Sequence, residues 1–249
     1  MNETLKYYLQ IADNALILSH RLAENTSKGP FLEEDLATAN VALDLIGLAE
    51  SMLNEAAKME GYGQTGDDLA YRREESDFVN CLLAEQPNRD FAHIVTRQFL
   101  MDTFNYHYFM ALTVSKDPFL SAIAFKSLKE VTYHLRRSSE WIIRLGTGTD
   151  ESKHRVKLAI NTLWKFTDEL FEESDADKAM LANGFGVHLT EIKDQWTQKV
   201  NEILFLAQLT APNNQFSVRG GKKGVHTEHL GHILAEMQFL PGKYPDAEW

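Results

Sequence analysis

The chain of 249 residues has one cysteine, Cys81, and is poor in proline and glycine, with 6 and 14 residues. A single thiol excludes an internal disulfide framework and a cysteine-based metal cluster, and it is typical of reducing compartments. The N-terminus lacks the basic and apolar regions of a signal peptide. We also find no uninterrupted apolar run of about 18 residues, the length that predicts a membrane-spanning helix. We therefore expect a cytoplasmic protein without a membrane partner.

Positive charge is the next scarce feature, because 25 Lys and Arg stand against 36 Asp and Glu and give a formal net charge of −11. An acidic chain is disfavoured as a ligand of nucleic acid or of anionic lipid. Local basic segments remain compatible with an anionic ligand or a protein partner.

Apolar residues recur at three- and four-residue spacing over most of the sequence, which is typical of amphipathic helices. Segments with the alternating pattern of strands are not evident. The chain is therefore predicted to be an all-α protein, a single domain over residues 1–249 with four long helices. We predict helices over residues 3–24, 33–60, 77–84, 90–115, 125–145 (starting after a break at 116–118), 151–173, 190–209 and 225–240. Glycines at 146 and 148 and Pro241–Gly242 are expected to end two of them.

Four acids lie in apolar surroundings, one on each long helix: Asp13, Asp44, Asp102 and Glu130. A buried carboxylate needs partners or a metal. Di-iron bundles use one acid from each of two helices and Glu-x-x-His from the other two. Here Gly47 and Tyr133 occupy the positions three residues after Asp44 and Glu130, and His134 comes one residue late. The pattern indicates a degenerate metal site that is now a buried network of hydrogen bonds and ion pairs.

Two further motifs lie near the C-terminus. His226, His229 and His232 are spaced at three residues, so they cannot share one tight helical face, and a helix start at Thr227 is the favoured interpretation over a metal site. Arg219, Lys222 and Lys223 lie among three glycines and are compatible with a phosphate ligand or with a partner protein. The glycine spacing is not that of a Walker motif. Arg219, Lys222, Lys223 and His226 are therefore candidates for partner or ligand contact.

Four phrases in order carry a resemblance to a known family. They are DLATANVALDLIGLAE at 35–50, LLAEQPNRDFA at 82–92, KEVTYHLRRSSEWIIRLGTGT at 129–149 and GGKKGVHTEHLGHILAEMQFL at 220–240. The chain resembles the PaaC family, the non-catalytic subunits of the bacterial phenylacetyl-CoA epoxidase (ring 1,2-epoxidase), a monooxygenase complex of phenylacetate catabolism. The resemblance implies a ferritin-like four-helix bundle with additional C-terminal helices.

The resemblance also implies partners and cofactors. In that family a related subunit, PaaA, carries the di-iron centre, PaaB joins the assembly, and the reductase PaaE holds flavin and iron–sulfur groups and takes electrons from NADPH. No catalytic, cofactor-binding or metal-ligating residue is transferred to this chain, and self-association is left open. Two other functions remain as alternatives: an autonomous di-metal oxidase or oxygenase using the four acids and His134, and a stand-alone CoA-ester binding protein using residues 219–224.

Overall fold

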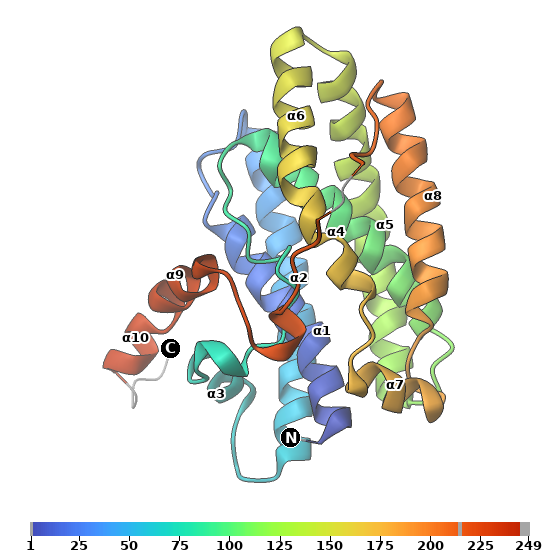
Figure 1. Ribbon diagram of the computed structural model, residues 1–249. Helices are drawn as coiled ribbons and strands as arrows, with labels where there is room; N and C mark the ends of the chain where they lie inside the picture. The colour runs from blue at the N-terminus through green and yellow to red at the C-terminus, as the bar shows by residue number, and fades with distance from the viewer. Residues whose placement is uncertain (1, 214–215, 245–249) are drawn as a thin grey trace. The chain divides into compact units, whose positions relative to one another are not determined.

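The structure is a computed structural model that describes residues 2–213 and 216–244. The described residues form helices, turns and loops, and no strand occurs among them, which confirms the predicted all-α class. The ribbon is shown in Figure 1. The long helices are α1 (Glu3–Ala23), α2 (Leu32–Glu60), α4 (Phe91–Leu112) and α5 (Pro118–Thr147); the others are α3 (Gly66–Tyr71), α6 (Asp150–Leu163), α7 (Asp175–Ala182), α8 (Leu189–Leu206), α9 (Glu228–Met237) and α10 (Phe239–Lys243).

The chain forms two compact units, the first made of residues 1–87 and 219–249 and the second of residues 88–218. Each unit contains one pair of packed long helices, α1 with α2 in the first and α4 with α5 in the second. Two such pairs are consistent with a ferritin-like bundle. The single domain expected over residues 1–249 stays a prediction.

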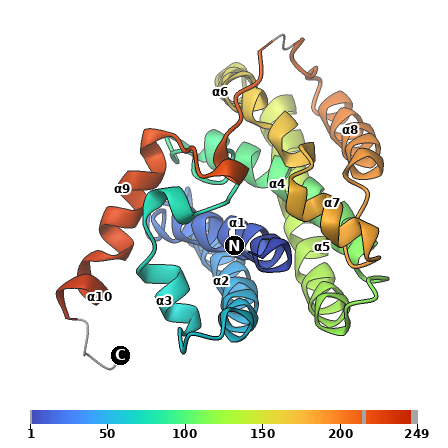
Figure 2. The ribbon, with the colours of Figure 1, turned by 60° about the horizontal axis from the view of Figure 1, so that its bottom comes forward.

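The first unit is built on α1, of which most residues are buried. Asn2 caps its N-terminus by accepting a hydrogen bond from the Thr4 amide at 3.1 Å. The short helix α3 lies beside α2 (Figure 2) and begins with a capping box, in which Thr65 and Asp68 each bind the other's backbone N–H. α9 packs on α1 and on the 3₁₀ turn η1 (Glu75–Asp77).

The helix predicted over residues 77–84 is wrong. Only the short turn η1 and a later turn form there, although residues 78–84 are all buried as the apolar sequence indicated. The reason is on α1, where the Asp13 carboxylate accepts the amide of Val79 at 2.9 Å and the Asn14 side-chain oxygen accepts that of Cys81 at 2.8 Å. These amides are satisfied by side chains, so no helix runs through residues 79–81, and only a turn follows, in which the Ala84 amide donates to the Cys81 carbonyl at 3.0 Å.

The second unit packs α4 against α5, α6 and α8. Asp90 caps α4 by accepting the His93 amide, and Asp117 accepts the amides of Phe119 and Leu120 at the start of α5. The Trp196 indole on α8 donates to the Leu100 carbonyl at 3.0 Å, which fixes α8 on α4. The helix predicted over 151–173 ends at Leu163 and continues as two 3₁₀ turns, and α7 was not predicted.

Two predicted helix ends are also corrected. α5 continues through Gly146 to Thr147, and Gly148, the other glycine expected at this end, is its C-cap. Gly146 instead permits a close approach, because a Cβ there would lie 2.3 Å from the Ala207 carbonyl oxygen. Pro241 was expected to end the last helix, yet α10 contains it. Proline is tolerated in the first turn of a helix, where its missing N–H would have no helical partner.

Helix α2 differs from the expectation that no helix would have the character of a membrane span. It is long and apolar enough to cross a membrane by length and composition, and 44% of its most apolar window is buried. Core helices pass the same test. The buried residues of α2 include Val41, Leu45 and Met52, and α2 packs along α1.

Candidate functional site

Asp13, the first candidate metal ligand, is fully buried on α1 and is bound by Arg73. Both terminal nitrogens of the guanidinium donate to the two carboxylate oxygens, and the Val79 amide donates to one of them. Arg73 also covers the ring of Phe78, 4.1 Å from its centroid, and donates to the Asp77 carbonyl at 3.1 Å. The carboxylate is therefore used to hold the loop after α3 on α1.

Asp44 and Gly47 lie on α2 in the same unit as Asp13. Asp44 is partly exposed. A Cβ at Gly47 would meet nothing within 4 Å, so the position expected to carry a ligand histidine faces open space. This side of α2 does not form an enclosed ligand sphere within its unit.

Asp102 on α4 is fully buried in the second unit. Gln98 donates to one carboxylate oxygen at 2.6 Å and Ser138 of α5 donates to the other at 2.8 Å. Burial raises the pKa of Asp102 to about 6, against the opposing effects of His134, Ser138, Gln98 and Arg137. Asp102 and His134 are thus neighbours.

The remaining candidates on α5 do not share one environment. His134 is buried, at 2% exposure, whereas Tyr133 is 40% exposed and its ring lies 5.7 Å from the guanidinium of Arg136. Glu130 is partly exposed. The residue three positions after Glu130 therefore faces outward, and the imidazole one position later faces Asp102.

These contacts test whether the four acids fit a di-metal centre. Asp13 and Asp44 belong to the first unit, and Asp102 and Glu130 to the second. Among the described residues, no group of three or more His, Cys, Asp or Glu side chains is arranged to hold a metal ion. The two buried carboxylates already accept hydrogen bonds on both oxygens, which are the atoms that a metal would need. Asp13 and Asp102 are therefore engaged by protein donors within their own units, a use of their oxygens that does not fit metal ligation.

A third buried carboxylate, Glu85, was not among the sequence candidates. One of its oxygens accepts from the Thr227 amide and hydroxyl, both at 2.7 Å. The other lies 2.9 Å from the Asn80 amide nitrogen and 2.9 Å from His226 Nδ1. Neither the Glu85 nor the His226 side chain has exposed surface. Glu85 therefore holds the start of the C-terminal segment, residues 219–244, on the loop that precedes residue 88.

His226 is consequently part of a buried pair. Burial lowers its pKa, but the hydrogen bonds to Glu85 and to the Phe78 carbonyl and the negative charges of Glu85 and Glu75 outweigh this effect and raise the pKa above the ordinary 6.5. Arg21 of α1 adds a second connection, since it donates to the backbone carbonyls of Glu85 at 2.9 Å and of His229 at 3.1 Å. Thr227 is the residue at the start of α9, as predicted, but its side chain does not cap the helix and its hydroxyl donates to Glu85 instead.

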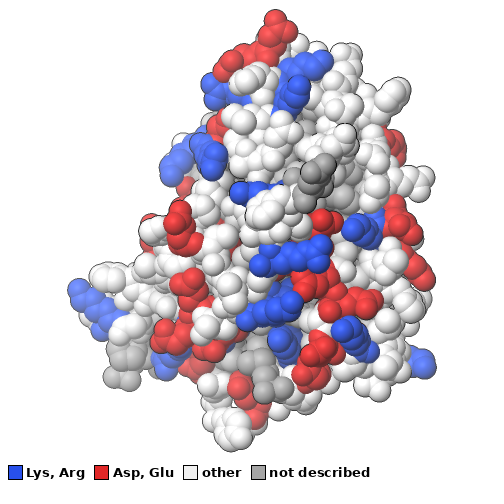
Figure 3. Space-filling model, in the orientation of Figure 1, with Lys and Arg blue, Asp and Glu red and all other residues white. Residues whose placement is uncertain are grey.

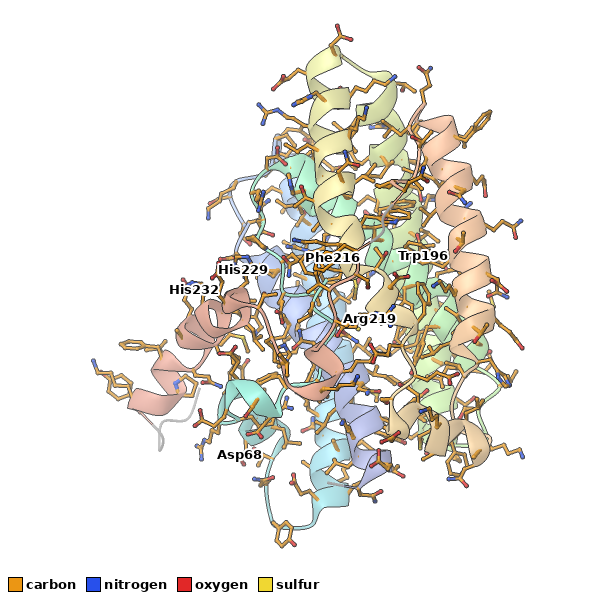
Figure 4. All side chains as sticks on the ribbon, in the orientation of Figure 1. Asp68, Trp196, Phe216, Arg219, His229 and His232 are labelled. Carbon is orange, nitrogen blue, oxygen red and sulfur yellow. The ribbon has the colours of Figure 1, made fainter. Side chains whose placement is uncertain are left out.

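The histidine cluster does not converge on one point. His226 is buried against Glu85, His229 is partly exposed, and His232 is exposed. Figure 4 shows His229 and His232 on α9. Burial, followed by the charge of Arg21, lowers the pKa of His229.

The basic loop at 219–224 packs its backbone on its own unit. A Cβ at Gly221 would lie 2.1 Å from the Asn80 carbonyl oxygen, and a Cβ at Gly224, whose φ is 74°, would lie 2.2 Å from the Ser76 carbonyl oxygen. The glycines therefore permit close contact with residues 76–82. Lys222 is only 6% exposed, whereas Arg219 and Lys223 are exposed. Contact of these residues or of His226 with a partner or ligand stays a prediction. Acidic and basic side chains are interspersed over the face in Figure 3.

The sequence contained a signal for Glu85 that periodicity did not use. Glu85 is a single acid at the end of the apolar run VNCLLA, and isolated acids in such runs require a partner. Its partners are 141 and 142 residues further along the chain. Helical spacing relates only residues within a few turns of one another, so it could not predict these partners of Glu85.

Comparison with known proteins agrees with these features. The family of phenylacetic acid catabolic proteins that comprises PaaA and PaaC matches residues 1–249. The chain belongs to this family. It is also 45% identical to the C subunit of the 1,2-phenylacetyl-CoA epoxidase of Escherichia coli strain K12, and the alignment covers all 249 residues and the whole of both chains.

Proposed function

We propose that this chain is a non-catalytic, structural subunit of a phenylacetyl-CoA 1,2-epoxidase complex in aerobic phenylacetate catabolism. Two facts support the proposal: the full-length similarity to a named subunit of such an epoxidase, and the engagement of both buried candidate ligands by protein donors. The engagement of these ligands supports the non-catalytic role, because the Asp13–Arg73 and Asp102–Ser138 contacts connect different parts of the fold. Their oxygens are committed to the fold.

The proposed partners are the catalytic subunit PaaA, the small subunit PaaB and the reductase PaaE. Within the complex the di-iron centre belongs to PaaA, and the flavin and iron–sulfur groups that receive electrons from NADPH belong to PaaE. The role of this chain is to present a rigid helical surface that orients the catalytic subunit. A cytoplasmic location follows from that role.

Metal content and activity test the proposal. The chain is purified alone and co-expressed with the other epoxidase subunits, and iron per chain and epoxidation of phenylacetyl-CoA are measured. We expect neither stoichiometric iron nor epoxidation from the chain alone. In the complex we expect both, and the double variant Asp44→Ala with Glu130→Ala should leave the iron content and the activity unchanged. These two acids are partly exposed, so the double variant is expected to fold.

Two outcomes would contradict the proposal. Near-stoichiometric iron in the chain alone, lost in the double variant, would instead support an autonomous di-metal oxidase. Tight binding of phenylacetyl-CoA to the chain alone, abolished by Lys222→Ala with Lys223→Ala, would support a CoA-ester binding protein. A Lys223→Ala single variant separates a ligand contact from a packing defect, because Lys223 is exposed and Lys222 is buried.

A further inference from the structure

Helix α2 has an exposed apolar stripe opposite its buried face. Leu32, Leu36 and Leu43 are 68%, 55% and 65% exposed. At 100° per residue these three side chains lie within about 40° of one another around the helix axis. Gly47 and Glu50 continue the same line toward the C-terminal end. A contiguous row of exposed leucines on a long helix is typical of a surface that another helix covers.

The stripe lies in a strongly acidic setting. Between Leu32 and Ala57 the helix contains no Lys or Arg, and its six acids are Glu33, Glu34, Asp35, Asp44, Glu50 and Glu55. At 100° per residue, Glu33 and Asp35 lie at the sides of the stripe and Glu50 lies in it, so a partner that covers the stripe meets negative charge there. Complementarity requires that the partner supply cations.

A pocket of about 220 Å³ opens at the C-terminal half of the stripe, within the first unit. Its floor is formed by the buried apolar residues Leu16 of α1, Leu53 of α2 and Ala70 of α3. The polar groups that line it are Glu50 and Asn54 of α2 and Asp67 and Tyr71 of α3. The pocket thus joins an apolar floor to a polar rim.

The rim carries negative charge that the described part of the chain does not neutralise. Glu50 and Asp67 are exposed and form no ion pair with a described Lys or Arg; the nearby cations Lys58 and Arg72 pair with Glu55 and Asp68. Burial and then the charge of Asp67 raise the pKa of Tyr71, which places that charge next to the pocket. The pocket fits a side chain with an apolar stem and a cationic head, which is the chemistry of lysine and arginine.

We propose that the exposed face of α2 and this pocket form one docking surface for a helix of a partner subunit. That helix packs an apolar stripe on Leu32, Leu36 and Leu43 and inserts a lysine or arginine between Glu50 and Asp67. The leucine at 36 and the acid at 50 are about 21 Å apart along the axis, so the partner helix needs about four turns. The inference rests on the proposed function, which supplies the partner subunit.

Charge favours this occupant over the two alternatives. A second copy packed by two-fold symmetry about Leu43 would place Glu33 of one chain within about one turn of Glu50 of the other, which is repulsive. Binding to an anionic bilayer is opposed by the same six acids and by the lack of cations on the helix between Leu32 and Ala57.

Gly47 gives a sharp test, because it lies in the stripe and a Cβ there would meet nothing within 4 Å. A tryptophan at this position obstructs a docking helix without entering the core. Gly47→Ala is the matched control, since one methyl group fills little of the interface. The pocket is tested separately with Glu50→Gln and Asp67→Asn, which remove both charges and keep the shapes.

Binding of each variant to the separately purified catalytic subunit is measured by biolayer interferometry at low and high salt, with circular dichroism as a check on folding. We expect Gly47→Trp to raise the Kd by at least about tenfold and Gly47→Ala to leave it unchanged. The neutralised pair should raise the Kd by about tenfold and reduce its salt dependence.

The outcomes separate the inference from the proposed function. If the wild-type chain does not bind the catalytic subunit, the proposed function fails. If the wild type binds and the folded Gly47→Trp and neutralised variants bind equally well, the docking surface is wrong. Light scattering and flotation with anionic vesicles complete the test: a wild-type dimer that Gly47→Trp dissociates, or vesicle binding by the wild type, would overturn the proposed occupant.

Discussion

Removal of the Glu85 carboxylate should release the C-terminal segment from the first unit. Glu85→Ala deletes an acceptor of contacts from Asn80, His226 and Thr227. The Asn80 amide retains the Cys81 carbonyl at 3.2 Å, and the Thr227 hydroxyl is free to rotate. The Thr227 N–H and the His226 Nδ1 are left without this acceptor in a buried place.

The magnitude follows from those two groups. A buried donor without an acceptor costs about 1–3 kcal/mol, so the substitution should cost about 2–6 kcal/mol. Loss of one member of a buried ion pair gives a similar value, about 3–5 kcal/mol. The decrease in the free energy of global unfolding cannot exceed the free energy needed to detach residues 219–244 from the first unit. Once that segment opens, water can bind both unsatisfied groups. The Arg21 contacts to the carbonyls of Glu85 and His229 use no Glu85 side-chain atom and should persist until then.

Hydrogen exchange by mass spectrometry and urea denaturation measure the two parts of the effect. We expect faster exchange of the α9 amides, including Leu230, together with a lower free energy of unfolding. Glu236→Ala is the control, because Glu236 is an exposed acid on the same helix. Equal exchange and equal stability in Glu85→Ala and Glu236→Ala would refute the reasoning.

Three further predictions concern single groups. Because the pKa of His226 is raised in the folded state, the His226–Glu85 pair contributes its full stability below pH 6.5 and loses it as the pH rises through the folded pKa. Hydrogen exchange of the α9 amides should therefore accelerate over that pH window. Glu85→Gln should abolish this pH dependence. Asp102 is the opposite case, because its pKa is about 6 in the folded state and 3.8 in an ordinary carboxyl group, a difference that disfavours the folded state by about 3 kcal/mol at pH 7. Asp102→Asn should therefore recover part of this free energy of unfolding in urea denaturation at pH 7.5. At pH 3.5 the substitution should recover none. Gly47→Ala should raise the melting temperature slightly, because alanine stabilises an open helix position by about 0.5–1 kcal/mol.

Periodicity was sufficient to predict the presence of the long helices and the all-α class, although α5 begins at Pro118, seven residues before the predicted start at 125. α1, α2 and α4 begin within one residue of the predicted positions, and α1 and α2 also end within one. Hydrophobic spacing decides these elements, because each long helix buries a broad face. The short helices were missed where local chemistry decided. α3 and α7 each begin with a capping box, Thr65 with Asp68 and Ser174 with Asp177, and such motifs identify a helix start that a six- or eight-residue pattern is too short to reveal.

The candidate site was predictable in part. The cost of burying Asp13 and Asp102 indicated that each has a partner, and each has one. Arg73 could not be named as the partner of Asp13, because 60 residues separate them and the intervening loop has no periodic pattern. Ser138 could have been found: it lies one turn after His134 on the stripe that faces α4.

The buried acids of the first unit have a common use that a metal-site template conceals. Asp13 holds the loop after α3 on α1 through Arg73, and Glu85 holds the C-terminal segment on that loop through His226 and Thr227. Arg21 of α1 connects to both the loop and the C-terminal segment, since it donates to the backbone carbonyls of Glu85 and His229. A carboxylate that accepts hydrogen bonds from distant parts of the chain fixes them in one arrangement, and the same group as a metal ligand would need those lone pairs. Asp13 and Glu85 therefore each join parts of the first unit that are distant in the sequence, and this use of their oxygens is incompatible with a second use as metal ligands.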